Sequence, residues 1–141
     1  MIILDTNVVS EPLRPQPKRS VVEWLDAQSI ETLYLTSITL AEIRLGIAVL
    51  PDGRRKKVLH QRFEREVVPA FGDRILSFDA QASTHYAQLR ASARTRGRAL
   101  GDFDALIASI AASHRFIVAT RDTSPFEVVD IPVLDPFTYT E

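Results

Sequence analysis

The sequence predicts an α/β fold in which a five-stranded parallel sheet is sandwiched between helices, and two patterns support this prediction. Short apolar runs without polar alternation, such as residues 2–4 and 116–119, are typical of strands buried on both faces of a parallel sheet. These runs alternate with segments of helical periodicity, and parallel neighbours need such crossover connections. The chain has 141 residues, which fits a single domain over residues 1–141.

The first half of the chain contains two of the predicted strands, at residues 2–4 and 33–35. A short helical turn at residues 7–14 is stopped by prolines, which remove a hydrogen-bond donor and clash with the preceding turn. Apolar residues recur at helical spacing in the next segments, and the sequence Pro51-Asp52-Gly53 breaks the pattern. The helices predicted on this basis span residues 18–28, 39–49 and 54–68.

The second half contains the other three predicted strands, at residues 74–78, 116–120 and 131–134. Asp79 can cap a helix over residues 80–95, which Gly97 ends. The most apolar helix is predicted at residues 104–113, and a turn is expected around Pro125. The pattern does not specify the order of the strands in the sheet.

Composition narrows the possible functions. The chain has no cysteine, which excludes disulfides and thiolate metal sites. No signal peptide or membrane-spanning run is visible, so we expect a cytoplasmic protein without a membrane partner. The net charge of −1 gives no global attraction to nucleic acid. Each of two local basic clusters is either a solvated helix face or part of the path by which a substrate approaches. The clusters are residues 54–57, and Arg90, Arg94, Arg96 and Arg98.

Acidic residues stand at the beginnings or ends of several predicted elements. Asp5 follows the first strand, and Asp122 follows the fourth. Glu42 lies on the third helix, and both Asp102 and Asp104 stand where the apolar helix begins. Because the carboxyl ends of parallel strands meet at one edge of a sheet, where open α/β folds bind ligands, we expect some of these acids to converge there.

Each acid also has a purely structural explanation. Aspartate is favoured at helix N-termini and at turns, and Thr39 with Glu42 has the spacing of a capping box. Such roles do not explain why so many elements of one chain carry acid at their ends. Clustered carboxylates would repel one another by about 1–4 kcal/mol per close pair, and a divalent cation removes this cost. An oxygen donor set without cysteine suits Mg²⁺ or Mn²⁺.

Four segments of the chain resemble the signature motifs of PIN-domain ribonucleases: Ile2–Val8, Leu40–Ile43, Asp104–Ala108 and Ala119–Asp122. More narrowly, the chain is similar to the VapC family, the toxins of VapBC toxin–antitoxin pairs, and its opening Leu4–Pro12 is closest to the FitB-like branch. The resemblance runs to about Pro136. It implies a PIN-like parallel sheet, a homodimer, Mg²⁺ or Mn²⁺ as cofactor, and endonucleolytic hydrolysis of RNA.

The resemblance also implies roles for individual residues. The family's four acidic positions, which are catalytic and bind the metal, fall on Asp5, Glu42, Asp104 and Asp122. The resemblance implies that Thr6, Asn7 and Thr120 position the acids or metal-bound water. Asp102 is an additional acid beside the third position. The implied partner is a cognate antitoxin (VapB- or FitA-like), whose C-terminal segment covers the acidic cleft and which can tether the toxin to operator DNA.

Two other functions fit parts of the pattern. One is a non-catalytic PIN-like module that binds partners, which predicts a missing acid, and none of the four is missing. The other is an aspartate-based phosphatase or phosphoacceptor. A phosphatase of the haloacid-dehalogenase type needs an aspartate where this chain has Asn7, and both types need a late lysine, whereas the last lysine here is Lys57.

Overall fold

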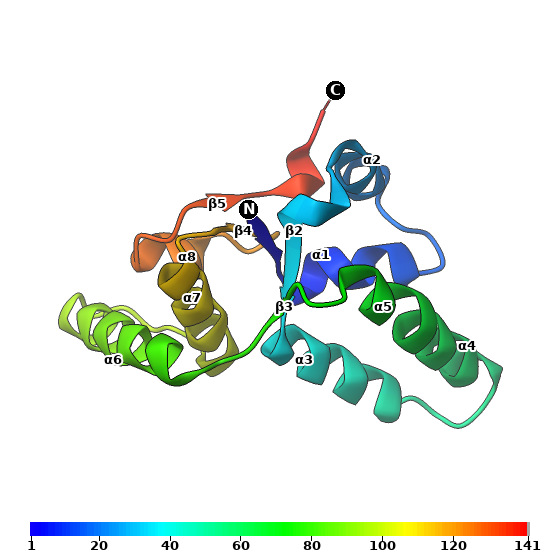
Figure 1. Ribbon diagram of the computed structural model, residues 1–141, viewed down its shortest axis with the longest axis horizontal. Helices are drawn as coiled ribbons and strands as arrows, with labels where there is room; N and C mark the ends of the chain where they lie inside the picture. Colours follow the sequence, from blue (N-terminus) through cyan, green and yellow to red (C-terminus); the bar gives the residue numbers. More distant parts are fainter. Residues whose placement is uncertain (141) are drawn as a thin grey trace.

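The computed structural model describes residues 1–140 and contains a parallel sheet with helices on both faces (Figure 1). The strand order is β3-β2-β1-β4-β5, and every neighbouring pair is parallel. The predicted fold class is therefore confirmed, and the first strand of the chain lies at the centre of the sheet. The strands are β1 (Ile2–Leu4), β2 (Leu33–Thr36), β3 (Ile75–Leu76), β4 (Ile117–Ala119) and β5 (Val133–Leu134).

The helices form two layers (Figure 1). One face of the sheet is covered by α6 (Ala80–Thr95), α7 (Asp102–His114) and α8 (Ser124–Val128). The other face is covered by α1 (Thr6–Ser10), α2 (Arg19–Ala27), α3 (Ser37–Ala48), α4 (Arg54–Arg62) and α5 (Val68–Phe71). Among residues 1–140, none of these helices combines the length and the apolar character needed to cross a membrane.

The central strand contributes to both layers of the core. Ile3 packs into the cluster that includes Ile107 and Ile110 of α7, whereas Leu4 packs with Val8 and Ile43 on the opposite face. Successive side chains of a strand point to opposite faces, so an uninterrupted apolar run serves both layers. The burial of both residues fixes the position at which Asp5 emerges from the sheet.

Several predicted boundaries differ from the observed ones. The helix predicted over residues 54–68 is divided into α4, a π-helical turn (Phe63–Val67) and α5. Pro69 has no N–H to donate to the preceding turn, and the Val68 N–H donates instead to the Phe63 carbonyl, five residues back. Pro125 lies in the first turn of α8, where a missing N–H costs little, and not in an open turn. The edge strands β3 and β5 are shorter than predicted.

The connections reverse direction at the centre of the sheet. From β1 the chain moves to β2 and β3 on one side, and β4 and β5 then fill the other side. The carboxyl ends of β1 and β4 therefore border a topological switch point, where open α/β sheets form a crevice. Asp5 and Thr120 are the residues that directly follow these two strands.

Candidate active site

Asp5 occupies the centre of this edge and is held through both carboxylate oxygens. Its Oδ1 accepts a hydrogen bond from the Thr6 backbone N–H at 2.8 Å, so Asp5 is the N-cap of α1. Its Oδ2 accepts from the Thr120 hydroxyl at 2.8 Å. Only 6% of Asp5 is exposed. The capping role and the predicted site role therefore coexist, because the cap fixes the direction in which the carboxylate points.

Thr120 connects Asp5 with the loop that follows β4. This fully buried hydroxyl donates to Asp5 and accepts hydrogen bonds from the Asn7 side-chain Nδ2 at 3.2 Å and from the Asp122 backbone N–H at 3.1 Å. Asn7 Oδ1 in turn accepts from the Arg121 backbone N–H at 3.0 Å. The hydroxyl uses all its hydrogen-bonding capacity, so the network leaves little freedom to the residues around it.

Glu42 does not form the predicted capping box. Helix α3 begins at Ser37, and its N-cap is Thr36, whose hydroxyl accepts from the Thr39 backbone N–H at 3.1 Å. The Glu42 Oε1 accepts instead from the Thr6 hydroxyl at 2.7 Å. Thr36 is the last residue of β2 and is fully buried, so its hydroxyl is held at the N-terminus of α3. Because Thr36 caps the helix, the Glu42 carboxylate is available to bind Thr6, the residue after Asp5.

The two aspartates at the start of α7 have different surroundings. The helix begins at Asp102, two residues before the predicted start. Asp102 is exposed and forms an ion pair with Arg90 of α6, at 3.1 Å between Oδ1 and Nη2. Burial and the negative charges of the other three predicted site acids raise the pKa of Asp104 to about 6. Asp104, and not Asp102, therefore belongs to the acidic group.

Burial and mutual repulsion dominate the electrostatics of this edge. The pKa of Asp5 is raised mainly by burial, against the hydrogen bonds from Thr120 and Thr6, and the charge of Asp122 adds to the increase. The pKa of Glu42 is also raised by burial, with a further contribution from Asp5. Within residues 1–140 no lysine, arginine or histidine forms an ion pair with any of the four acids. The group therefore carries like charges without a protein counter-charge.

The side chains at this edge offer oxygen donors to a divalent cation. Across the described residues, no three acid or histidine side chains are arranged closely enough to hold a metal ion by themselves. Mg²⁺ usually binds one or two carboxylates directly and keeps several waters, so a wider group of acids suits a hydrated ion. The charges of Asp5, Asp122 and Glu42 all raise the pKa of Asp104, so a positive charge beside Asp104 would relieve this repulsion. The residues present thus fit a hydrated Mg²⁺ or Mn²⁺.

Comparison with known proteins identifies the family. The PIN domain model matches residues 2–132. This chain belongs to the PIN-domain family. It is 50% identical to the VapC ribonuclease Y4jK of Sinorhizobium fredii, over 97% of this chain and 98% of the relative. It is also 50% identical to the toxin FitB of Neisseria gonorrhoeae, over 97% of this chain and 99% of the relative.

Solved PIN-domain structures agree with this placement. The structure of FitAB bound to an IR36 DNA fragment superposes with a TM-score of 0.95 at 48% identity, covering 100% of this chain and 99% of the solved one. The predicted resemblance to the FitB-like toxins is therefore confirmed. Thr36, the N-cap of α3, is a residue of the site that the sequence patterns do not predict, although it directly follows a predicted strand.

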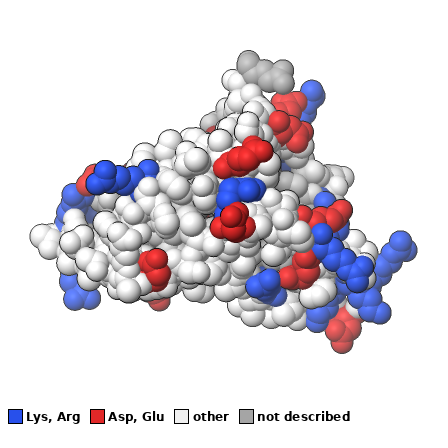
Figure 2. Space-filling model, in the orientation of Figure 1, with Lys and Arg blue, Asp and Glu red and all other residues white. Residues whose placement is uncertain are grey.

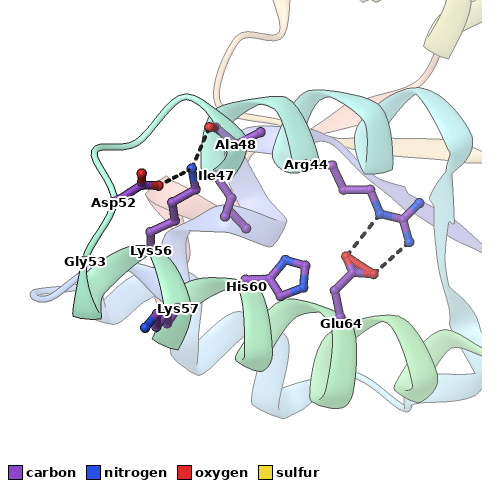
Figure 3. Close-up of a pocket in the computed structure, with 9 residues that line it drawn as sticks. All are labelled: Arg44, Ile47, Ala48, Asp52, Gly53, Lys56, Lys57, His60 and Glu64. Atoms are coloured by element: carbon purple, nitrogen blue, oxygen red, sulfur yellow. Dashed lines mark hydrogen bonds and ion pairs between the residues drawn. The ribbon is translucent and has the colours of Figure 1, made fainter.

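This PIN domain also has a cavity away from the acids, between α3 and α4 (Figure 3). It has a volume of about 700 Å³. Arg44 pairs there with Glu64 at 2.8 Å, and the Lys56 Nζ contacts both the Asp52 carboxylate at 3.3 Å and the Ala48 carbonyl at 3.0 Å. None of the predicted site residues lines this cavity, and two of its cations are paired with acids that also line it.

Proposed function

We propose that this chain is the toxin of a toxin–antitoxin pair and hydrolyses RNA phosphodiester bonds with Mg²⁺ or Mn²⁺. The observation that carries the proposal is the group of acids without an ion-pair partner at the β1/β4 edge, which comes from four separate parts of the chain: Asp5, Glu42, Asp104 and Asp122. The names of the FitB-like relatives, a ribonuclease and a toxin, support the same function.

In the proposed mechanism the acids of this chain hold and orient the cation. Asp5 and Asp104 would bind it directly, while Glu42 and Asp122 would act through water or hold a second ion. A bound divalent ion supplies an acidified water and neutralises charge that develops on the phosphate. Thr120 orients the Asp5 carboxylate, and Thr6 orients that of Glu42. Asn7 keeps the loop after β4 against α1 through the Arg121 N–H.

The test is hydrolysis of a labelled RNA with Mg²⁺ by the wild type and by Asp5→Asn and Asp104→Asn. Each variant keeps the side-chain size but removes a negative charge, and we expect each to lose activity by more than about 100-fold, beyond the usual cost of removing a supporting group. Asp26→Asn, at an exposed acid of α2, is the matched control and should cleave like the wild type. Undiminished cleavage by both site variants, or full activity in EDTA, would contradict the proposal.

A cognate antitoxin is the proposed partner. We infer that its C-terminal segment covers the acidic cleft and that the toxin itself is a homodimer. This inference rests on the likeness to FitB, whose solved complex with its partner is bound to DNA. Because the substrate is RNA, we assign the activity to the cytoplasm. Co-expression with the neighbouring small protein should give a stable complex; a chain that expresses freely alone and forms no complex would argue against the pairing.

A second function follows from the DNA in the FitAB structure. In complex with its antitoxin, this chain would serve as a scaffold for an antitoxin dimer that binds operator DNA. The two functions separate in Asp5→Asn, which should lose RNA cleavage and retain the DNA complex. A variant that loses both would show that they depend on the same residues.

A further inference from the structure

A second cavity opens between the C-terminal half of α6 and the loop that leads to α7. Its volume is about 790 Å³. Three arginines line it, and the remaining lining residues are alanine, threonine, glycine and leucine, without any acid. We call it the arginine pocket, after Arg90, Arg94 and Arg98. A pocket lined by cations and small residues is suited to an anionic ligand.

The cations of the arginine pocket are only partly neutralised. Arg90 pairs with Asp102 through Nη2, but its Nη1 is buried and has no hydrogen-bond partner. Arg94 and Arg98 form no ion pair among residues 1–140. Arg94 lies in the last turn of α6, where the helix dipole stabilises a positive charge. Arg98 lies beyond the end of α6, so the dipole does not account for its charge. These arginines therefore retain donors for an external acceptor.

A short stretch of chain links the arginine pocket to the candidate active site. The last residues that line the pocket are Ala99 and Leu100, and the next residue of the chain is Gly101, the N-cap of α7. A Cβ at Gly101 would lie 3.4 Å from the Asp104 Oδ2, so the end of this loop touches the acidic group. A ligand long enough to follow this loop from the arginine pocket would reach the acids.

An exposed aromatic residue lies at the same junction. Phe103 is 52% exposed, whereas every other Phe, Tyr and Trp within residues 1–140 is buried or partly buried. It stands between Asp102, which points to α6, and Asp104, which belongs to the acidic group. Successive helical residues project about 100° apart, so Phe103 points in a third direction, away from both. Exposing an aromatic ring beside two acids contributes nothing to the core.

We propose that this junction binds single-stranded RNA on one side of the scissile phosphate, with backbone phosphates in the arginine pocket and an unpaired base stacked on Phe103. The proposal rests on the proposed nuclease function and deepens it. Aromatic rings and arginines are the usual partners of splayed bases and of the strand's backbone. Only an unpaired base has a free face for Phe103, so the substrate at this position is single-stranded.

The other basic cluster, residues 54–57, is a less suitable path. Figure 2 shows basic side chains gathered at two ends of the molecule, over the α6 end and over the α4 end. The α4 cluster lies beyond the whole of α3 (Ser37–Ala48), about 18 Å of helix from the acidic edge. Its Lys56 is already bound to Asp52 and to the Ala48 carbonyl. In the α6 cluster, Arg94 and Arg98 form no ion pair among residues 1–140, and Arg90 pairs with Asp102, two positions before Asp104 on α7.

The experiment measures binding of a fluorescein-labelled single-stranded RNA to full-length protein that carries Asp5→Asn, so that cleavage does not interfere. Adding Phe103→Leu should weaken binding about tenfold, whereas Phe103→Tyr, which keeps the ring, should stay within about twofold. Arg94→Gln with Arg98→Gln should also weaken binding about tenfold and reduce the slope of log affinity against log salt by about 1.4, the value for two phosphate contacts of a single strand. The matched pair Arg54→Gln with Arg55→Gln should leave both quantities unchanged.

The assignment would be overturned by unchanged affinity in Phe103→Leu, by weakened affinity in Arg54→Gln with Arg55→Gln, or by equally tight binding of fully paired RNA. A changed oligomeric state of Phe103→Leu in light scattering would also overturn it, because Phe103 would then be a subunit contact. A wild type that cleaves RNA while Phe103→Leu binds normally would contradict this inference alone. A wild type that neither binds nor cleaves RNA would instead contradict the proposed function.

Discussion

The acidic edge of the sheet and the cavity between α3 and α4 use similar charged side chains in opposite arrangements. At the edge, burial and the charge of at least one other acid raise the pKa of each of Asp5, Glu42 and Asp104. No cation within residues 1–140 forms an ion pair with them. In the cavity, the Arg44 guanidinium donates two hydrogen bonds to the Glu64 carboxylate, so each charge is paired with its opposite. One region is left electrostatically incomplete, and the other is complete without a ligand.

This difference separates function from support. A folded chain that keeps like charges together loses stability unless something outside the chain binds there, so the acidic edge points to an external cation. Paired charges need no such partner and contribute only modestly at the surface. Three substitutions test this difference, from the largest expected effect to the smallest.

Thr120→Val should weaken RNA cleavage by about 10–100-fold, the usual cost of removing a group that orients a metal ligand. The substitution keeps the volume of this buried residue but removes the hydroxyl that donates to Asp5. Since that hydrogen bond lowers the pKa of Asp5, the acid limb of the pH–rate profile should move to higher pH. The measurement is cleavage rate against pH in Mg²⁺, with Thr120→Ser as a control that keeps the hydroxyl. An unchanged rate in Thr120→Val would remove Thr120 from the site.

Asp104→Asn should make the metal-free protein more stable at pH 7.5, by about 1 kcal/mol after allowing for solvent screening. The folded pKa of Asp104, about 6, lies above its ordinary value of 3.8. Protonation of Asp104 therefore stabilises the fold fully below pH 3.8, and this contribution is lost as the pH rises through about 6. Asparagine resembles the protonated form at every pH, so the advantage of the variant should vanish near pH 4. Urea unfolding in EDTA at pH 4, 6 and 7.5, beside Asp26→Asn, checks the trend; equal stability at pH 7.5 would contradict it.

Arg44→Gln should change little. The Arg44–Glu64 pair is largely exposed, so its loss should cost less than about 0.5 kcal/mol, and RNA cleavage should remain at the wild-type rate. Thermal unfolding and the cleavage assay measure the two effects. A tenfold loss of cleavage would mean that the α3–α4 cavity takes part in the reaction, and the contrast between the two regions would no longer hold.

The parts of the fold that depend on local sequence were predictable. The apolar run at residues 2–4 is buried on both faces, and Asp5 follows it at the sheet edge, as the pattern indicates. The order of the strands depends on how distant segments pack, so it is absent from any local pattern. The sequence does not predict the π-helical turn before Pro69, because the apolar residues keep their helical spacing across it.

The site was predictable in its residue types but less so in its contacts. Thr36, Ser37 and Thr39 are all suited to cap α3, and the choice of Thr36 depends on its burial at the end of β2. Glu42 turns to Thr6, which lies 36 positions away in the sequence. The difference between Asp102 and Asp104 likewise depends on Arg90, a residue of another helix.

The hydrogen bond between Thr120 and Asp5 spans 115 positions of the chain. The middle strand of the sheet is thus the first to leave the ribosome, yet its neighbour β4 and the threonine that orients Asp5 are synthesised near the end. A nascent chain consequently carries Asp5 long before the groups that complete its surroundings exist. The acidic edge can therefore be assembled only after β4 and Thr120 have been synthesised.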